Sequence, residues 1–291
     1  MTRNLDWSVD GQRWPNREAS RFVDAGGLRW HVQVMGQGPV LLLLHGTGAA
    51  THSWRSLAPK LATEHTIIAP DLPGHGFSAT PARSDGFSIT NVARAVSALL
   101  ETLDVTPHAI VGHSAGAAIA VRMALDGAVP QSRLIGINAA LLPFPGPLGP
   151  WAPTLARAFF YNPMALSLFV HRAAQPGAIA ALMRSTGSSL DAEGLELYEL
   201  LFRSRGHLEA TVALMAHWDL YALKAALPAL TNPLTLIVAG EDRAVPPSSA
   251  AEVARLVARA RVLTVPRLGH LAHEEDADAI SALILESLRD R

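Results

Sequence analysis

Short apolar segments recur along the chain and are separated by segments with a helical period. Residues 22–35 alternate in polarity around a Gly-Gly turn, which predicts a β-hairpin. The apolar runs that follow contain few polar residues, as is typical of strands buried on both faces of a sheet. We expect such strands at residues 40–46, 66–71, 108–113, 134–139, 234–242 and 261–266.

Segments with helical spacing lie between these runs. Residues 89–103 have apolar side chains at every third or fourth position, which predicts a helix with one buried face. Residues 53–65 show a similar stripe, although Pro59 must either lie in the first turn or kink the helix. Because strand and helix alternate at both ends of the chain, we expect an α/β fold with a mostly parallel sheet flanked by helices.

Residues 141–228 interrupt this alternation. They begin with a segment rich in Pro and Gly and continue through helical patterns without a clear strand. Aromatic side chains are concentrated here and charged ones are scarce. We therefore expect a helical cap at 141–228, inserted into a sheet domain formed by 1–140 and 229–291.

Composition excludes several classes of function. A 49% hydrophobic content with a net charge of −1 argues against a disordered chain and against a general nucleic-acid binder. The absence of cysteine excludes disulfides, thiolate nucleophiles and zinc sites built on sulfur. The first residues lack the pattern of a signal peptide, and no apolar run reaches the ~18 residues that span a bilayer. We expect a cytoplasmic protein.

The strongest chemical signal is the sequence GHSAG at residues 112–116. It fits G-x-S-x-G and lies between a predicted buried strand and a helical run of small residues, which is the context this motif requires. A serine on such a sharp turn presents its hydroxyl above the sheet, and the amides at the start of the helix favour negative charge. Ser114 is therefore a candidate nucleophile.

A serine hydroxyl is a weak nucleophile at neutral pH, so Ser114 needs a base and a group that orients it. With this motif, the acid and then the His follow the nucleophile along the chain, each after a late strand. Asp242 and His270 occupy such positions. Glu241 is an alternative acid, and His273 is an alternative base. We favour His270 because Gly269 permits a tight loop, whereas His273 resembles the start of a solvated helix.

Two further glycine-rich strand ends accompany GHSAG. HGTG at residues 45–48 predicts half of an oxyanion site, in which the backbone amides of Thr47 and Ala115 converge on a carbonyl oxygen. DLPGHG at residues 71–76 is assigned a shaping role, with its histidine structural, like His113 within GHSAG. No phosphate loop, dinucleotide fingerprint or H-E-x-x-H motif is present, so we expect no cofactor and no metal.

Together these motifs resemble the α/β-hydrolase superfamily over nearly the whole chain. The resemblance implies that Ser114 is the nucleophile, His270 the general base and Asp242 its orienting acid, with Thr47 and Ala115 as oxyanion donors. A Ser nucleophile disfavours the branches that use Asp, the epoxide hydrolases and haloalkane dehalogenases.

Several segments also resemble the magnesium-chelatase accessory proteins of bacteriochlorophyll biosynthesis, a family within this superfamily. They include WPNREASRFV, LLLLHGTGAATHSWR, INAALLPF and MAHWDL. This resemblance implies a role near magnesium insertion into protoporphyrin and a magnesium-chelatase subunit as partner. It also gives the cap a purpose: its apolar side chains would line a pocket for a flat apolar ligand such as a tetrapyrrole, or else pack the cap on the sheet domain. They are Trp151, Phe159, Phe160, Tyr161, Phe169, Met183, Phe202, Met215, Trp218 and Tyr221.

Two functions of different class therefore remain. The first is a serine hydrolase that acts on an ester, amide or lactone through an acyl-enzyme at Ser114. The second is an accessory protein that keeps the scaffold and works by binding a porphyrin or a chelatase subunit. Hydrolysis of a C–C bond or peroxidase-like chemistry on the same residues stays open as a third.

Overall fold

One eight-stranded sheet forms the centre of the protein, whose computed structural model describes residues 4–143, 162, 164, 172, 175 and 177–289. The strand order is β1-β2-β4-β3-β5-β6-β7-β8. Strand β2 is antiparallel to both neighbours, and all pairs from β4 to β8 are parallel. The strands are β1 (Ser20–Ala25), β2 (Leu28–Met35), β3 (Val40–Leu44), β4 (Thr66–Pro70), β5 (Ala109–His113), β6 (Arg133–Ile137), β7 (Leu234–Ala239) and β8 (Ala260–Val265).

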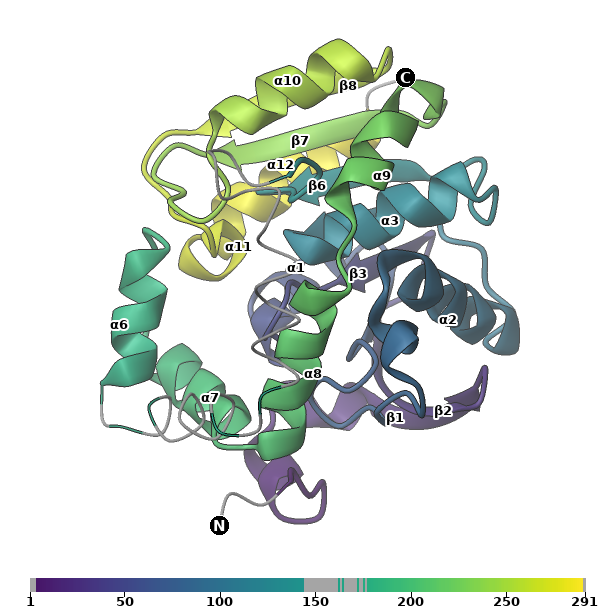
Figure 1. The fold of residues 1–291 in the computed structure, drawn as a ribbon. Coiled ribbons are helices and arrows are strands. Elements are labelled where there is room, and N and C mark those ends of the chain that lie inside the picture. The colour runs from purple at the N-terminus through teal and green to yellow at the C-terminus, as the bar shows by residue number, and fades with distance from the viewer. Residues whose placement is uncertain are drawn as a thin grey trace.

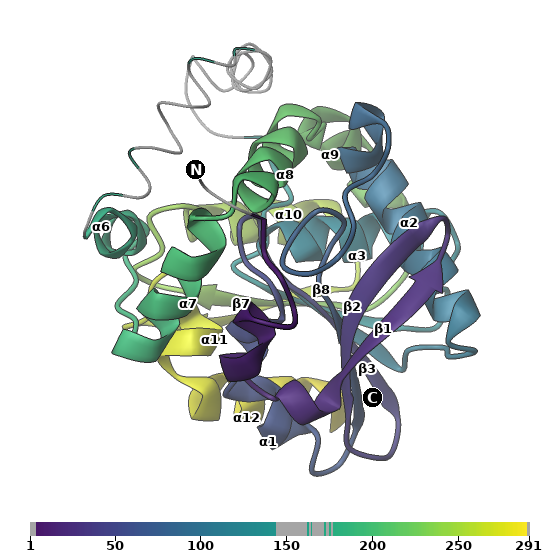
Figure 2. The ribbon, with the colours of Figure 1, turned by 90° about the horizontal axis from the view of Figure 1, so that it is seen from below.

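Helices cover both faces of the sheet (Figures 1 and 2). The α-helices are α1 (Leu57–Leu61), α2 (Ile89–Thr102), α3 (Ala115–Leu125), α6 (Ala178–Ser185), α7 (Ala192–Phe202), α8 (Arg205–Ala216), α9 (Leu220–Ala226), α10 (Ser248–Leu256), α11 (Ala272–Glu275) and α12 (Ala277–Arg289). Short 3-10 helices are η1 (Asp10–Arg13), η2 (Arg17–Ala19), η3 (Thr51–Trp54), η4 (Ser84–Phe87) and η6 (Leu227–Ala229). Helices α2, α3 and α10 lie on one side of the sheet, and α1, α11 and α12 lie on the other (Figure 2).

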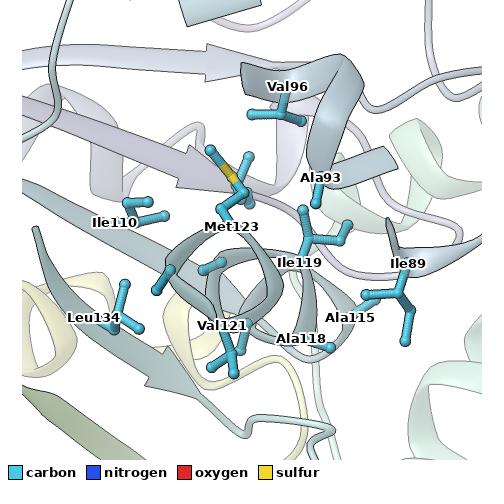
Figure 3. Packing of buried hydrophobic residues seen from close by; sticks show 14 of the residues in the cluster. Ile89, Ala93, Val96, Ile110, Ala115, Ala118, Ile119, Val121, Met123 and Leu134 are labelled. Atoms are coloured by element: carbon cyan, nitrogen blue, oxygen red, sulfur yellow. The ribbon is translucent and has the colours of Figure 1, made fainter. Parts of the chain in front are cut away.

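The apolar strands divide their side chains between two cores. In β3, Leu42 and Leu44 join the cluster under α2 and α3, whereas Leu41 and Leu43 join the cluster under α1 and α12. This period of two, with both faces buried, is why the strand shows an unbroken apolar run in the sequence. Figure 3 shows the first cluster, in which the small residues of α3 let that helix pack closely against α2 and the strands.

The predicted hairpin and the α/β fold class are confirmed, and all six apolar runs form strands. The expectation of burial on both faces is wrong for β8, which lies at the edge of the sheet, where its side chains are only partly covered. The helix predicted at residues 89–103 is also confirmed as α2, whose Ser88 caps the amide of Asn91. The segment at 53–65 forms a much shorter α-helix than its period predicts. Pro59 lies in the first turn of α1, where its missing N–H costs no hydrogen bond, and the helix ends two residues later at Leu61.

The chain between β6 and β7 contributes helices α6, α7, α8 and α9, which we call the cap helices. Helix α7 contacts both α6 and α8, and α9 leads back toward β7 (Figure 1). Trp151 and Phe160, which the sequence analysis assigned to the pocket, lie outside the described residues, as do Phe159, Tyr161 and Phe169. Within the described ranges, no helix combines the length and the apolar character needed to cross a membrane.

Candidate active site

Ser114 occupies a strained turn between β5 and α3. Its backbone has φ 50° and ψ −109°, a conformation that costs a non-glycine residue about 1–3 kcal/mol. A side chain at Gly112 would collide with the backbone at Ala117, and one at Gly116 would collide with the carbonyl oxygen of Leu44. The two glycines of GHSAG therefore allow the turn, which holds the Ser114 side chain at the carboxyl end of the central strand.

His270 and Asp242 lie on neighbouring loops after β8 and β7. The Nδ1 atom of His270 is 2.8 Å from Oδ2 of Asp242, whose side chain is fully buried. The other oxygen, Oδ1, accepts the amides of Ala244 and Val245 at 2.7 and 2.8 Å. Since an ionised carboxylate only accepts hydrogen bonds, Nδ1 of His270 is the donor and Nε2 is left as an acceptor. Glu241, the alternative acid, is exposed.

His273 lies in the interior of the protein, so the expectation of a solvated helix there is wrong. Helix α11 packs against η3, and the exposed fraction of His273 is 0%. Its Nε2 atom bonds Oγ of Ser53 at 2.8 Å, and its ring lies 4.6 Å from that of Trp54. Burial first, and then the nearby His270 and Arg55, lower the pKa of His273 to about 3. This histidine is a neutral packing residue.

Two residues that sequence reasoning did not assign to the site hold the His270 loop from the sheet side. Asn138, just after β6, donates to the carbonyl oxygens of Gly269 and His270 at 3.0 and 2.9 Å, and its own oxygen accepts the amide of Ala239. His113 donates from Nε2 to the same His270 carbonyl at 2.9 Å. Burial first, then His273 and His270, lower the pKa of His113 well below its ordinary value, so it is neutral. The structural role of His113 is therefore to hold the backbone of the His270 loop through this hydrogen bond.

The amide of Thr47 lies on the loop after β3, and the amide of Ala115 begins α3 directly after Ser114. Within the described part of the chain neither amide has an acceptor, although Ala115 is fully buried. The side chain of Ala115 packs into the core beside α2 (Figure 3). Its amide is the first of α3. A side chain at Gly46 would meet the ring of His113 at 2.6 Å and Cβ of Ser114 at 3.3 Å, so this glycine lets the two loops approach closely.

The DLPGHG segment contacts the HGTG loop, because the amide of Leu72 donates to Nε2 of His45 at 2.9 Å. Asp71 is fully buried and accepts the amides of Thr51 at 2.7 Å and Phe77 at 2.9 Å, together with Nδ1 of His31 at 2.7 Å. These contacts outweigh its burial and hold the pKa of Asp71 far below its usual range. His75 is buried and donates to the carbonyl oxygen of Pro73. Both residues shape the loops.

A cavity of about 460 Å³ opens between these loops and the cap helices. Ser114, His270 and Thr47 line it from the sheet side. The described aromatic and methionine residues that the sequence analysis proposed for the pocket all line it from the cap: Met183, Phe202, Met215, Trp218 and Tyr221. Met183 and Phe202 also pack in an apolar cluster with Trp14, so lining and packing are combined in the same side chains.

The hydroxyls of three cap residues that line the cavity, Thr186, Thr211 and Tyr198, are bonded to other protein groups. Thr186 and Thr211 donate their hydroxyls to backbone carbonyls three and four residues earlier. The hydroxyl of Tyr198 donates to the buried carboxylate of Glu274 at 2.8 Å, which also pairs with Arg55. Burial raises the pKa of Glu274 even against the opposing charge of Arg55. Among the described lining residues there is no Asp, Glu, Lys or Arg, and the side of the cavity that the cap forms is mainly apolar.

No set of three or more His, Cys, Asp or Glu side chains suited to a metal ion occurs among residues 4–143 and 177–289. Three buried histidines, His273, His113 and His31, pair instead with hydroxyls, backbone atoms or carboxylates, as described above.

Comparison with known proteins places this geometry in context. A family model described as the alpha/beta hydrolase fold matches residues 39–277. The chain is 41% identical to the magnesium-chelatase 30 kDa subunit of Rhodobacter capsulatus, over 94% of this chain and 96% of that protein. It is 27% identical to 2-hydroxymuconate semialdehyde hydrolase of Pseudomonas sp. strain CF600, over 94% and 95% of the two chains. The crystal structure of an alpha/beta hydrolase fold protein from Burkholderia ambifaria superposes with a TM-score of 0.76 at 24% identity, covering 92% of this chain and 97% of that one.

Proposed function

Because this chain belongs to the α/β-hydrolase fold family, we propose that it is a serine hydrolase that cleaves an ester through an acyl-enzyme at Ser114. One observation carries the proposal above all others. His270, with Nδ1 tied to buried Asp242, lines the same cavity as Ser114 on its strained turn. A histidine oriented by a carboxylate and a serine hydroxyl that line one cavity are the groups that general-base activation of serine requires.

The reaction follows from the roles these groups can take. Nε2 of His270 accepts the hydroxyl proton as Oγ of Ser114 attacks the ester carbonyl, and Asp242 stabilises the imidazolium that forms. The carbonyl oxygen becomes an oxyanion between the amides of Thr47 and Ala115. His270 then returns the proton to the departing alcohol, which leaves the acyl-enzyme. Water attacks this ester with the same proton transfers and releases the acid.

The cavity wall indicates an apolar substrate. Because Thr186, Thr211 and Tyr198 direct their hydroxyls to other protein groups, the described cap offers mainly hydrocarbon and aromatic surface, with Nε1 of Trp218 as a donor that has no partner among the described residues. A substrate that buries polar groups against this wall would lose their hydration without compensation. The polar part of the substrate is then its scissile ester, with Trp218, Met215 and their neighbours contacting the rest.

Hydrolysis of 4-nitrophenyl esters of increasing chain length tests the proposal. The wild type should release 4-nitrophenol, and Ser114→Ala and His270→Ala should each lose roughly 10⁶-fold in kcat, or fall to the background, because nucleophile and base act as a unit. Ser248→Ala, an exposed serine at the start of α10, is the matched control and should keep full activity. Equal hydrolysis by Ser114→Ala and the wild type would refute the acyl-enzyme.

The similarity to a protein named as a magnesium-chelatase subunit favours a second candidate, an accessory role in bacteriochlorophyll biosynthesis. In this role the cap would bind a tetrapyrrole, or the protein would bind a chelatase subunit, and Ser114 would be dispensable. Titration with protoporphyrin and co-purification with magnesium-chelatase subunits measure the two forms of binding. Binding that survives Ser114→Ala, in cells whose pigment synthesis also survives it, supports this candidate over catalysis. Loss of pigment in that variant supports catalysis.

A further inference from the structure

The loop that carries His270 is held from two opposite sides. On the sheet side, Asn138 and His113 donate to carbonyl oxygens of the loop, at Gly269 and at His270 itself. These bonds restrain one edge of the backbone. The amides of Gly269 and Leu271 in the same loop are bonded to other partners, at or near the connection between α6 and α7.

The cap supplies the partners for that second edge. Oγ of Ser188, which is only 2% exposed, accepts the amide of Leu271 at 2.8 Å. Glu275 accepts the amide of Gly269 on Oε1 at 3.0 Å, and its Oε2 accepts the amide of Ser189 at 3.4 Å. Amides on both sides of His270 are therefore bonded to Ser188 or to a carboxylate that also reaches the cap.

Close packing joins the same cap connection to the loop of the proposed acid. Gly187 and Gly269 lie so near each other that a side chain at Gly269 would collide with the backbone of Gly187. A side chain at Gly187, which has φ 87°, would collide with the carbonyl oxygen of Glu241. The carbonyl oxygen of Thr186 accepts the amide of Arg243 at 3.0 Å. The residues on either side of Asp242 thus touch the cap connection as well.

We propose that Thr186, Gly187 and Ser188, together with Glu275, form a clamp through which the cap sets the position of His270 relative to Asp242. The inference rests on the proposed hydrolase function, and it makes Ser188 and Glu275 positioning residues. The cap then has a role in the chemical step in addition to forming the cavity wall. Loosening the clamp should slow proton transfer while leaving the wall, and therefore substrate binding, intact.

Ser188→Ala tests the clamp against Ser185→Ala. Both changes delete a serine hydroxyl that makes one hydrogen bond, but Ser185 is an exposed residue of α6 whose hydroxyl bonds its own helix at Leu182. Ser188→Ala should lower kcat about 10-fold with KM unchanged, since misplacement of a catalytic group by 1 Å costs roughly 100-fold. Ser185→Ala should keep both constants, and Ser188→Thr, which retains the hydroxyl, should recover kcat.

Glu275→Gln provides a second variant in case Ser188→Ala disturbs folding. A glutamine keeps one acceptor oxygen and turns its NH₂ toward the other backbone amide, so one of the two bonds is lost. We expect a fall in kcat similar to that of Ser188→Ala, with Glu196→Gln, an exposed residue of α7, unchanged. Equal kcat values in Ser188→Ala, Glu275→Gln and their controls would overturn the clamp.

A readout that needs no turnover separates this inference from the proposed function. The proton of the His270 Nδ1–Asp242 hydrogen bond gives a low-field NMR resonance when it is protected from exchange with water. It should be present in the wild type and in Ser185→Ala, and broadened or lost in Ser188→Ala. An unchanged resonance in Ser188→Ala overturns the clamp even if the enzyme is active. If the resonances behave as expected but the wild type hydrolyses no ester, the hydrolase function is refuted and the clamp is not.

Discussion

The two sides of the cavity use their polar groups in opposite ways. On the sheet side, Asp242 has both carboxylate oxygens bonded, and His270 keeps one nitrogen for the cavity. On the cap side, the hydroxyls of Thr211 and Tyr198 are hydrogen-bonded to other protein groups, so the cap presents mainly apolar surface to the cavity. In the proposed function, the sheet edge therefore supplies the reacting groups and the cap selects among substrates. The clamp at Ser188 is where the two sides meet.

The largest effect should come from the sheet side. Asp242→Asn keeps the size of the side chain but removes the carboxylate that fixes the tautomer of His270, so kcat should fall roughly 10⁴-fold. Glu241→Gln, the neighbouring exposed acid, is the control and should stay within about 2-fold of the wild type. Steady-state hydrolysis of one ester by the two variants gives the comparison. The reverse order of the two effects would assign the acid to Glu241.

Acid pH should destabilise the contact that His207 makes between the cap helices and the sheet domain. His207 on α8 accepts the amide of Gly76 and donates to the carbonyl oxygen of Gly48, and burial lowers its pKa from 6.5 to about 4. In the unfolded chain His207 therefore binds a proton below about pH 6.5, whereas in the folded chain it binds one only below about pH 4. As the pH is lowered between these two values, the free energy of unfolding should fall by about 1.4 kcal/mol per pH unit because of this one residue.

Urea unfolding at pH 7, 6 and 5 measures this dependence. His207→Gln, which has no ionising group, should lose stability less steeply than the wild type as the pH falls. His273, with a pKa of about 3, adds a slope of the same sign in both proteins. Parallel slopes for the wild type and His207→Gln would show that His207 is not held neutral in the folded protein.

A moderate effect should come from the apolar wall. Trp218→Ala removes aromatic surface from the cap side of the cavity, so we expect KM to rise about 10-fold, as for the loss of a 1.4 kcal/mol contact. The kcat value should change less than 2-fold, because Trp218 touches neither His270 nor Asp242 through any hydrogen bond that the structure describes. The rise should grow with the acyl chain length of the ester. A loss confined to kcat would place this wall in the chemical step.

The smallest effect should come from Tyr198→Phe. The hydroxyl points to Glu274, so its removal leaves the cavity surface aromatic and KM should stay within about 2-fold. Thermal unfolding should show a loss of about 1–3 kcal/mol, because the buried carboxylate of Glu274 loses a donor. A large rise in KM with unchanged stability would mean that this hydroxyl faces the substrate, and that the wall is less apolar than described.

Local patterns in the sequence predicted the parts of the molecule that depend on neighbouring residues. The apolar runs predicted the strands because burial on both faces leaves no polar position, and GHSAG predicted a strained turn because only small neighbours fit there. The prediction was wrong where tertiary packing decides. His273 is buried because α11 turns into the core against η3, a contact between residues 220 positions apart in the chain.

The residues that hold the His270 loop had no signal in the sequence. Asn138, Ser188 and Glu275 belong to three separate segments, and their roles arise from hydrogen bonds to backbone atoms, which any residue provides. A left-handed backbone at Asn138, with φ 46°, follows a strand that looks ordinary in sequence. Single polar residues of this kind become interpretable only when the topology brings their partners together.

The central claim, that Ser114 is a nucleophile activated by His270, is tested most directly by covalent labelling. Incubation of the folded protein with a fluorophosphonate, followed by intact-mass measurement and peptide mapping, reports the reacting residue. One adduct per chain should form on Ser114, be absent from Ser114→Ala, and form far more slowly in His270→Ala than in the exposed-serine control Ser248→Ala. A folded wild type that stays unlabelled, or an adduct on another serine, would contradict the account.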